Sequence, residues 1–262
     1  MAQVGFFQIA LMFFLPFLCV LLPILIGQRY GLFIKSKEGT VNDAPVGSVV
    51  GASLGLLAFM LAFTFQIVDN RYSTRKELLL DEVTTIRTTY LRAGLIPEPF
   101  RSESKKLLLE YVDLRYDVVK NFTPQKVELL KTRSQSILDK LWKYSETLAE
   151  QDRSSEAYSL YTTSINDLVD IYNKRITLTF EYRIPTTILW VLFIIVQFSM
   201  FVLGYQFGIS DKRNNTIAIC ISIIFASVMW LILALDRPET GLIRLNQNPL
   251  ITLREQLLYS RK

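Results

Sequence analysis

One stretch, Asp43–Arg92, constrains what this chain can fold into more than any other. Residues 44–68 carry no charged side chain, and charges begin at Asp69. No proline interrupts the stretch between Pro45 and Pro97. As a single helix, its uncharged part is about 37 Å long, which is enough to cross a bilayer, and its charged part extends about as far again into water. The stretch therefore predicts a transmembrane helix that continues beyond the membrane.

A stripe of small and aromatic residues at four-residue spacing runs along the uncharged part of this helix. Its members are Gly47, Gly51, Gly55, Phe59 and Phe63. Small residues let helices approach closely in lipid, so Gly47 and Gly51 predict helix packing. Phe59 and Phe63 project about 40° apart on an ideal helix. We interpret the stripe as the wall of a pore, and packing against lipid or other helices is the alternative for the two phenylalanines.

Four uncharged runs predict an integral membrane protein, because 18 or more apolar residues suffice to span a bilayer. The predicted spans are Val4–Gly27, Ala44–Val68, Ile184–Phe207 and Thr216–Leu235. Gln28–Asp43 is expected to be a polar loop. Gly204 and Gly208 show the four-residue spacing only once, so we give them no weight. The predicted domains are 1–69 and 184–235 for the four transmembrane helices, 70–183 for a helical domain continuous with them, and 236–262 for a tail.

The segment between the second and third spans predicts a helical bundle. Apolar residues recur at helical spacing over Phe100–Lys120, from Pro124 to about Glu150, and from Ser155 toward the third span, and strand alternation is not sustained. The fold class is therefore all-α, with four transmembrane helices and a cytoplasmic bundle. Glu82, Arg87 and Arg92 lie among threonines on the long helix, where a solvated face is the favoured interpretation and hydrogen bonding between subunits is the alternative.

Composition argues against an enzyme. The chain has no histidine, which removes the commonest metal ligand and acid–base catalyst. Its two cysteines lie inside apolar runs, where cysteine behaves as a small hydrophobic residue. No phosphate-binding loop, nucleophile with a base or metal-spaced cluster is visible. We expect no catalytic residue, no cofactor and no metal. Residues 70–183 hold 19 Lys and Arg against 17 Asp and Glu, so nucleic acid is not expected as a partner either.

Basic residues near the ends of the spans predict the orientation. The side with the large helical domain carries eight: Arg71, Arg75, Lys76, Lys174, Arg175, Arg183, Arg237 and Arg244. The other side carries five: Arg29, Lys35, Lys37, Lys212 and Arg213. Because cytoplasmic loops are enriched in Lys and Arg, both termini and the large domain are expected in the cytoplasm. The first span alone favours the opposite orientation, since Arg29 follows it and nothing basic precedes it.

Charged residues follow the second span immediately. Asp69, Arg71, Arg75 and Lys76 are candidates for the charge at the inner mouth of a pore. Repeated around a ring, the three cations would attract anions, although they also fit juxtamembrane anchors. For Asp69 we favour pairing with Arg71 or with an arginine of a neighbouring chain, because an unpaired carboxylate at a membrane boundary is costly.

Several motifs resemble one family of membrane proteins. They are Gly55-Leu56-Leu57-Ala58-Phe59, Phe63-Thr64-Phe65, Arg71-Tyr72 with Arg75, Tyr90-Leu91-Arg92-Ala93 with Pro97, and Tyr111-Val112-Asp113-Leu114-Arg115. Together they resemble the bestrophin-like family of bacterial and plant membrane proteins, a distant relative of the bestrophin anion channels. The resemblance implies a pentamer with a hydrophobic neck at Gly55, Phe59 and Phe63, and a place in the bacterial inner membrane. Ser73 departs from the bestrophin pattern, and Asp236 with Glu239 supplies too few carboxylates for a calcium clasp.

Two functions of different classes follow from these observations. The first is an oligomeric, pentameric ion channel that selects anions such as chloride and is lined by the second span, with lipid and identical subunits as its partners. The second is a membrane-anchored scaffold or sensor that binds a partner through its bundle, because residues 70–183 exceed what a minimal pore requires. A transporter is a weaker third, since the spans show no clear internal repeat.

Overall fold

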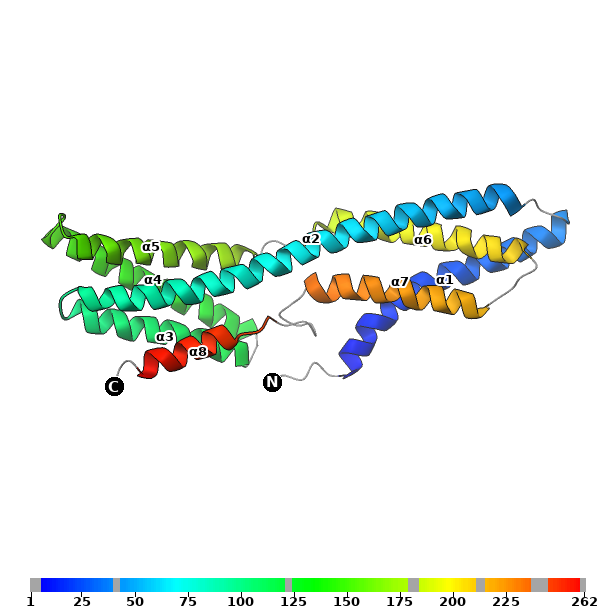
Figure 1. Ribbon diagram of the computed structural model, residues 1–262. Helices are drawn as coiled ribbons and strands as arrows, with labels where there is room; N and C mark the ends of the chain where they lie inside the picture. The colour runs from blue at the N-terminus through cyan, green and yellow to red at the C-terminus, as the bar shows by residue number, and fades with distance from the viewer. Residues whose placement is uncertain are drawn as a thin grey trace. The chain divides into compact units, whose positions relative to one another are not determined.

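The computed structural model describes residues 6–39, 43–120, 124–178, 184–210, 215–236 and 245–259 (Figure 1). Within these ranges all regular structure is helical, which confirms the predicted all-α class, and the cytoplasmic placement of the bundle stays a prediction. The elements are α1 (Phe6–Glu38), α2 (Asp43–Arg92), η1 (Ala93–Leu95), α3 (Phe100–Lys120), α4 (Pro124–Gln151), α5 (Glu156–Ile176), α6 (Thr186–Ile209), α7 (Asn215–Asp236) and α8 (Asn248–Tyr259). Arg183, Lys212, Arg213, Arg237, Glu239 and Arg244, used above for orientation and for the calcium comparison, lie outside the described residues.

The chain divides into two compact units. The membrane unit contains Val4–Tyr72 and Arg183–Arg244, and the bundle unit contains Ser73–Tyr182 and Leu245–Lys262. Among the described residues, four helices are long and apolar enough to span a membrane: α1, α2, α6 and α7. Each unit has its own core of buried apolar residues.

The helix α2 is the 50-residue element that the sequence predicts, from Asp43 to Arg92 (Figure 1). Its buried residues recur at three- and four-residue spacing, as expected for a helix that packs along one face. They include Leu57, Leu61, Thr64 and Val68 in the membrane unit, and Leu79, Glu82, Ile86 and Thr89 in the bundle unit. A 3₁₀ turn, η1, follows directly and leads to Pro97, which cannot continue a helix.

The helix α1 is longer than predicted. Residues 28–38 are helical, so the expectation of a loop over Gln28–Asp43 is wrong for most of that segment. Tertiary contacts favour the extra turns, because Gln28 is buried and the ring of Tyr30 lies 6.0 Å from the rings of Phe201 and Tyr205 on α6. The helix ends where Gly39 adopts a φ of 80° and donates its N–H to the carbonyl oxygen of Lys35.

Glycines bring α1 and α6 into backbone contact. A Cβ atom on Gly27 would overlap the carbonyl oxygen of Phe201, and one on Gly204 would overlap that of Ile24. Gly31 and Gly208 approach each other in the same way one turn further along. The expectation that the spacing of Gly204 and Gly208 has no structural role is therefore wrong. Gly204 and Gly208 form the face of α6 that packs against α1, and Gly27 and Gly31 form the matching face of α1.

The core of the bundle unit is built by α3, α4 and α5 with part of α2. Tyr111, Leu141 and Tyr161 are fully buried in it. The helix α8 packs on α3 and buries Leu250, Leu253 and Leu257. It lies within the segment that was predicted only as a tail. The side-chain oxygen of Asn246 accepts a hydrogen bond from the N–H of Asn248 at 2.9 Å and so caps the start of α8.

Candidate functional site

Most of the predicted stripe on α2, from Gly51 onward, is open within the described part of the chain. A Cβ atom on Gly51 or Gly55 would meet no atom within 4 Å, and one on Gly47 would lie 3.2 Å from Nε2 of Gln206 on α6. Phe59 and Phe63 are 65% and 51% exposed. Gly47 therefore packs against α6 within the chain, whereas Gly51 and Gly55 leave their space open, and any close packing at Gly51 would involve atoms outside the described residues, such as those of another chain.

Contacts on the opposite face of α2 determine that the stripe points away from the core of the membrane unit. Leu57, Leu61 and Val68 are buried there in the core of the membrane unit. Ser199 on α6 donates its hydroxyl to the carbonyl oxygen of Ser53 at 3.2 Å. These contacts hold one face of the helix against the unit, so the face that carries Phe59 and Phe63 points away from it.

Asp69 does not pair with Arg71 within the chain, and its pairing with an arginine of a neighbouring chain stays a prediction. Arg71 pairs with Asp236, the last residue of α7, at 3.8 Å rather than with Asp69. Asp69 is half-buried and makes no ion pair with any residue that the structure describes. Arg75 is only 7% exposed, whereas Lys76 is exposed. Lys76 is thus the most accessible of the three candidate cations for a role at the inner mouth.

A buried ion cluster joins three helices of the bundle unit. Glu82 on α2 is fully buried and accepts hydrogen bonds from the hydroxyl of Tyr111 at 2.7 Å and from Nη2 of Arg115 at 3.1 Å, both on α3. Nε of Arg175 on α5 lies 3.3 Å from the same carboxylate. The favoured solvated-face interpretation is therefore wrong for Glu82, whereas Arg87 is exposed in the single chain.

Electrostatics explain why Glu82 stays ionised in this cluster. Burial alone would raise the pKa of its carboxyl, but Arg115 and Arg175, with the hydrogen bonds from Tyr111 and Arg115, outweigh burial and hold the pKa below its usual value. Burial and the neighbouring carboxylate raise the pKa of Tyr111 well above its usual value, so its hydroxyl remains a donor. Two guanidinium groups surround one carboxylate, which suits a structural lock between α2, α3 and α5.

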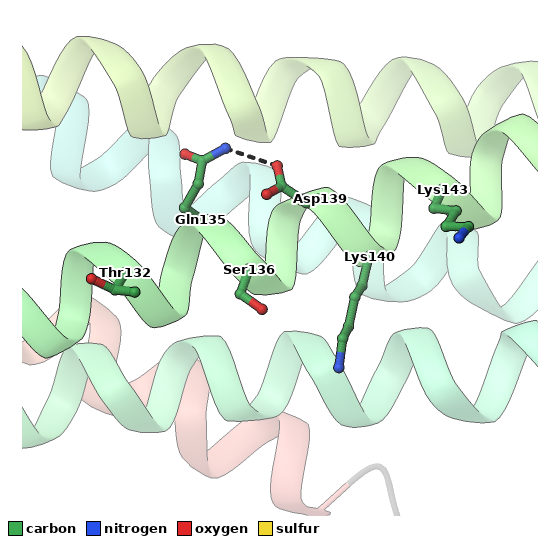
Figure 2. A pocket seen from close by; sticks show the side chains of 6 residues that line it. All are labelled: Thr132, Gln135, Ser136, Asp139, Lys140 and Lys143. Carbon is green, nitrogen blue, oxygen red and sulfur yellow. Dashed lines mark hydrogen bonds between the residues drawn. The ribbon is translucent and has the colours of Figure 1, made fainter.

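No constellation suited to catalysis appears in the described residues. Among them, no group of three His, Cys, Asp or Glu side chains could hold a metal ion. A hollow of about 430 Å³ lies on the surface of α4, where Nε2 of Gln135 donates to Oδ1 of Asp139 at 2.8 Å (Figure 2). Figure 2 shows that all six lining side chains come from this one helix. A hollow with a single wall cannot enclose a substrate.

The four spans and the helical bundle define the class: an all-helical integral membrane protein. The model of the Bestrophin-like domain matches residues 18–250, and the chain therefore belongs to the bestrophin-like family. This membership confirms the resemblance seen in the motifs and supports an ion-channel kind of function rather than an enzymatic one.

Solved structures share the fold. One crystal structure of a bacterial bestrophin homologue from Klebsiella pneumoniae is 18% identical, with a TM-score of 0.70 over 94% of this chain and 96% of that chain. A second variant of that homologue is 19% identical, with a TM-score of 0.67 over 97% and 99%. A structure described as a membrane protein is 17% identical, with a TM-score of 0.69 over 95% and 97%. No curated protein sequence gives a significant match.

Proposed function

We propose that the chain assembles into a pentamer whose α2 helices surround an anion-conducting pore, with a neck at Gly55, Phe59 and Phe63. The observation that carries this proposal is the face of α2 in the membrane unit, where two exposed phenylalanines and two glycines lack partners in the chain. Membership of the bestrophin-like family supports the same function.

The chemistry of the stripe suits a gate. Rings of Phe59 and Phe63 would form an apolar constriction that closes by dewetting and needs no tight ion binding. Gly47, Gly51 and Gly55 would leave the outer part of the pore wide or let neighbouring helices pack closely. Exposed Lys76 from every subunit would raise the local concentration of chloride at the inner mouth, and Arg71 and Arg75 would add to this field from more buried positions.

The proposed location is the bacterial inner membrane, with both termini and the bundle unit in the cytoplasm. The counts of basic residues near the span ends support this orientation. Lipid and four identical subunits are the proposed partners, and chloride is the proposed permeating ion. A cysteine placed at Tyr259, an exposed residue of α8, should react with a membrane-impermeant maleimide only after cells are opened.

The double variant Phe59→Ala/Phe63→Ala tests the proposed neck. Removing both rings should widen the constriction and raise chloride flux into liposomes by about tenfold, the effect of lowering a barrier by about 1.4 kcal/mol. Flux is measured with a chloride-sensitive dye at equal protein content. The matched control is Phe198→Ala/Ile224→Ala, which removes two exposed apolar side chains from α6 and α7 and should leave flux unchanged.

Native mass spectrometry of the purified protein gives the subunit count. Five subunits are expected, and a monomer or dimer would contradict the proposal because so few α2 helices cannot surround a pore. Equal flux in the neck variant, the control and protein-free liposomes would contradict it as well. Such results would favour a scaffold or sensor that binds a partner through the bundle unit.

A further inference from the structure

A second hollow, of about 490 Å³, lies in the bundle unit between α2 and the start of α8. Unlike the hollow on α4, it has walls from two segments that are far apart in the sequence. Its polar lining comprises Thr84, Arg87, Asn246, Asn248, Thr252 and Gln256, and Val83 and Leu253 add apolar surface. One cation, three carboxamides and two hydroxyls therefore face one space, and the described lining contains no carboxylate.

The side chain of Arg87 is available to a ligand. It is exposed and makes no hydrogen bond or ion pair with the residues that the structure describes. Two other arginines nearby in the sequence are engaged: Nη1 of Arg92 donates to the carbonyl oxygen of Leu160 at 3.0 Å, and Nε of Arg101 donates to that of Ile96 at 3.0 Å. Arg87 thus differs from its neighbours in having an unused guanidinium group that borders a hollow.

The wall opposite Arg87 is held in place by backbone contacts. The side chain of Asn246 caps the N–H of Asn248, and the carbonyl oxygen of Gln247 accepts from the N–H groups of Leu250 and Ile251 at 3.0 and 3.2 Å. Because these N–H groups already have acceptors, the N-terminal end of α8 is not itself an anion site. The side chains of Thr252 and Gln256, which follow on the same helix, supply the free polar groups.

We propose that this hollow between α2 and α8, called the α2–α8 groove below, binds a small organic monocarboxylate that carries hydroxyl groups. The planar guanidinium of Arg87 can bind both oxygens of a carboxylate, and the amides and hydroxyls can bind the hydroxyls of the ligand. Val83 and Leu253 suit its carbon skeleton. An amino acid fits less well, since the described lining offers no carboxylate for its ammonium group. The proposal concerns the bundle unit alone and does not depend on ion conduction.

Titration calorimetry with sodium gluconate tests the proposal on the full-length protein in mild detergent at low salt. Saturable binding in the millimolar range is expected. Arg87→Gln should weaken it by about tenfold or more, because the charge-assisted hydrogen bonds are lost. Thr252→Val, which removes one hydroxyl at nearly constant volume, should weaken it a few-fold. The control Lys140→Gln removes one exposed charge from the hollow on α4 and should bind gluconate like the wild type.

Three results would overturn the proposal. The first is the absence of saturable heat from wild-type protein that is folded by its melting curve. The second is an equal loss of gluconate affinity in Arg87→Gln and Lys140→Gln, or the displacement of gluconate by an equal concentration of chloride. Either result would show that the protein attracts anions in general by its charge. The third is a changed subunit count of Arg87→Gln in native mass spectrometry, which would make the α2–α8 groove a contact between copies of the chain.

Discussion

Glu82→Gln is expected to destabilise the folded protein by about 3–5 kcal/mol. The amide keeps the shape of the side chain and can still accept from the hydroxyl of Tyr111. It carries no charge, however, so Arg115 and Arg175 would remain buried without a counter-ion. The side chains of these arginines are only 8% and 12% exposed, and water cannot solvate them as it would at a surface. The measurement is the midpoint of denaturant unfolding, followed by the helical signal of the purified protein.

Glu110→Gln is the matched control for this experiment. Glu110 accepts a hydrogen bond from Arg133 at 2.6 Å, but both side chains are substantially exposed. Exposed pairs contribute little, so the loss should stay below about 1 kcal/mol. Equal losses in the two variants would contradict the assignment of Glu82, Arg115 and Arg175 as a buried structural lock.

The same cluster predicts how stability depends on pH. The pKa of Glu82 is lower in the folded protein than in the unfolded chain. The stability that this difference contributes is fully present above the unfolded pKa of about 4.3, and it is lost as the pH falls through the lower, folded-state pKa. The stability difference between wild type and Glu82→Gln should therefore shrink when unfolding is measured at progressively lower pH below about 4. A constant difference over that range would contradict the prediction.

The sequence predicts those elements of the fold that depend on local patterns. The length of α2 follows from its uncharged run, the charges after it and the prolines at its ends. The helices α3, α4 and α5 follow from apolar residues at helical spacing. The turns of α1 beyond Gln28 were missed because Gln28 is polar and Tyr30 is amphipathic. The burial of Gln28 and the contact of the Tyr30 ring with Phe201 both depend on α6.

Other features depend on partners that are distant in the sequence. Glu82 resembles any carboxylate on a charged helix, and its burial becomes visible only when Tyr111, Arg115 and Arg175 are brought together. The leucines of α8 do recur at three- and four-residue spacing, a signal that could have identified this helix. The α2–α8 groove could not be predicted, because it combines two segments about 160 residues apart.

The two sets of glycines show how one motif can have different consequences. The same four-residue spacing occurs at Gly47, Gly51 and Gly55 and in the pair Gly204 and Gly208. The sequence alone therefore cannot say which set packs against another helix of the same chain. In the structure the pair on α6 meets the backbone of α1, whereas Gly51 and Gly55 meet nothing within the described chain. Helix packing within the subunit therefore depends on Gly204 and Gly208, and the stripe on α2 remains available for contacts between subunits or for a pore.

Gly204→Ala is expected to destabilise the membrane unit by about 3 kcal/mol, the upper end of the usual cost of overpacking. The new methyl group would overlap the carbonyl oxygen of Ile24, and a helix backbone cannot move aside as a flexible side chain can. The helices α1 and α6 would have to separate, which would weaken the contact of Tyr30 with Phe201 and Tyr205 as well. The measurement is the thermal unfolding of the purified protein in one detergent.

Gly55→Ala is the matched control, because it adds the same methyl group to a membrane helix where the chain leaves open space. Alanine has the higher helix propensity, by up to about 1 kcal/mol, so this variant should unfold at the same or a slightly higher temperature. A comparable loss of stability in both variants would mean that Gly55 is also in a close contact, one that the described residues do not supply and that a neighbouring subunit would provide. Native mass spectrometry of Gly55→Ala would then show fewer subunits. If the Gly204→Ala variant unfolds at the same temperature as the wild type, the close contact between α1 and α6 is contradicted.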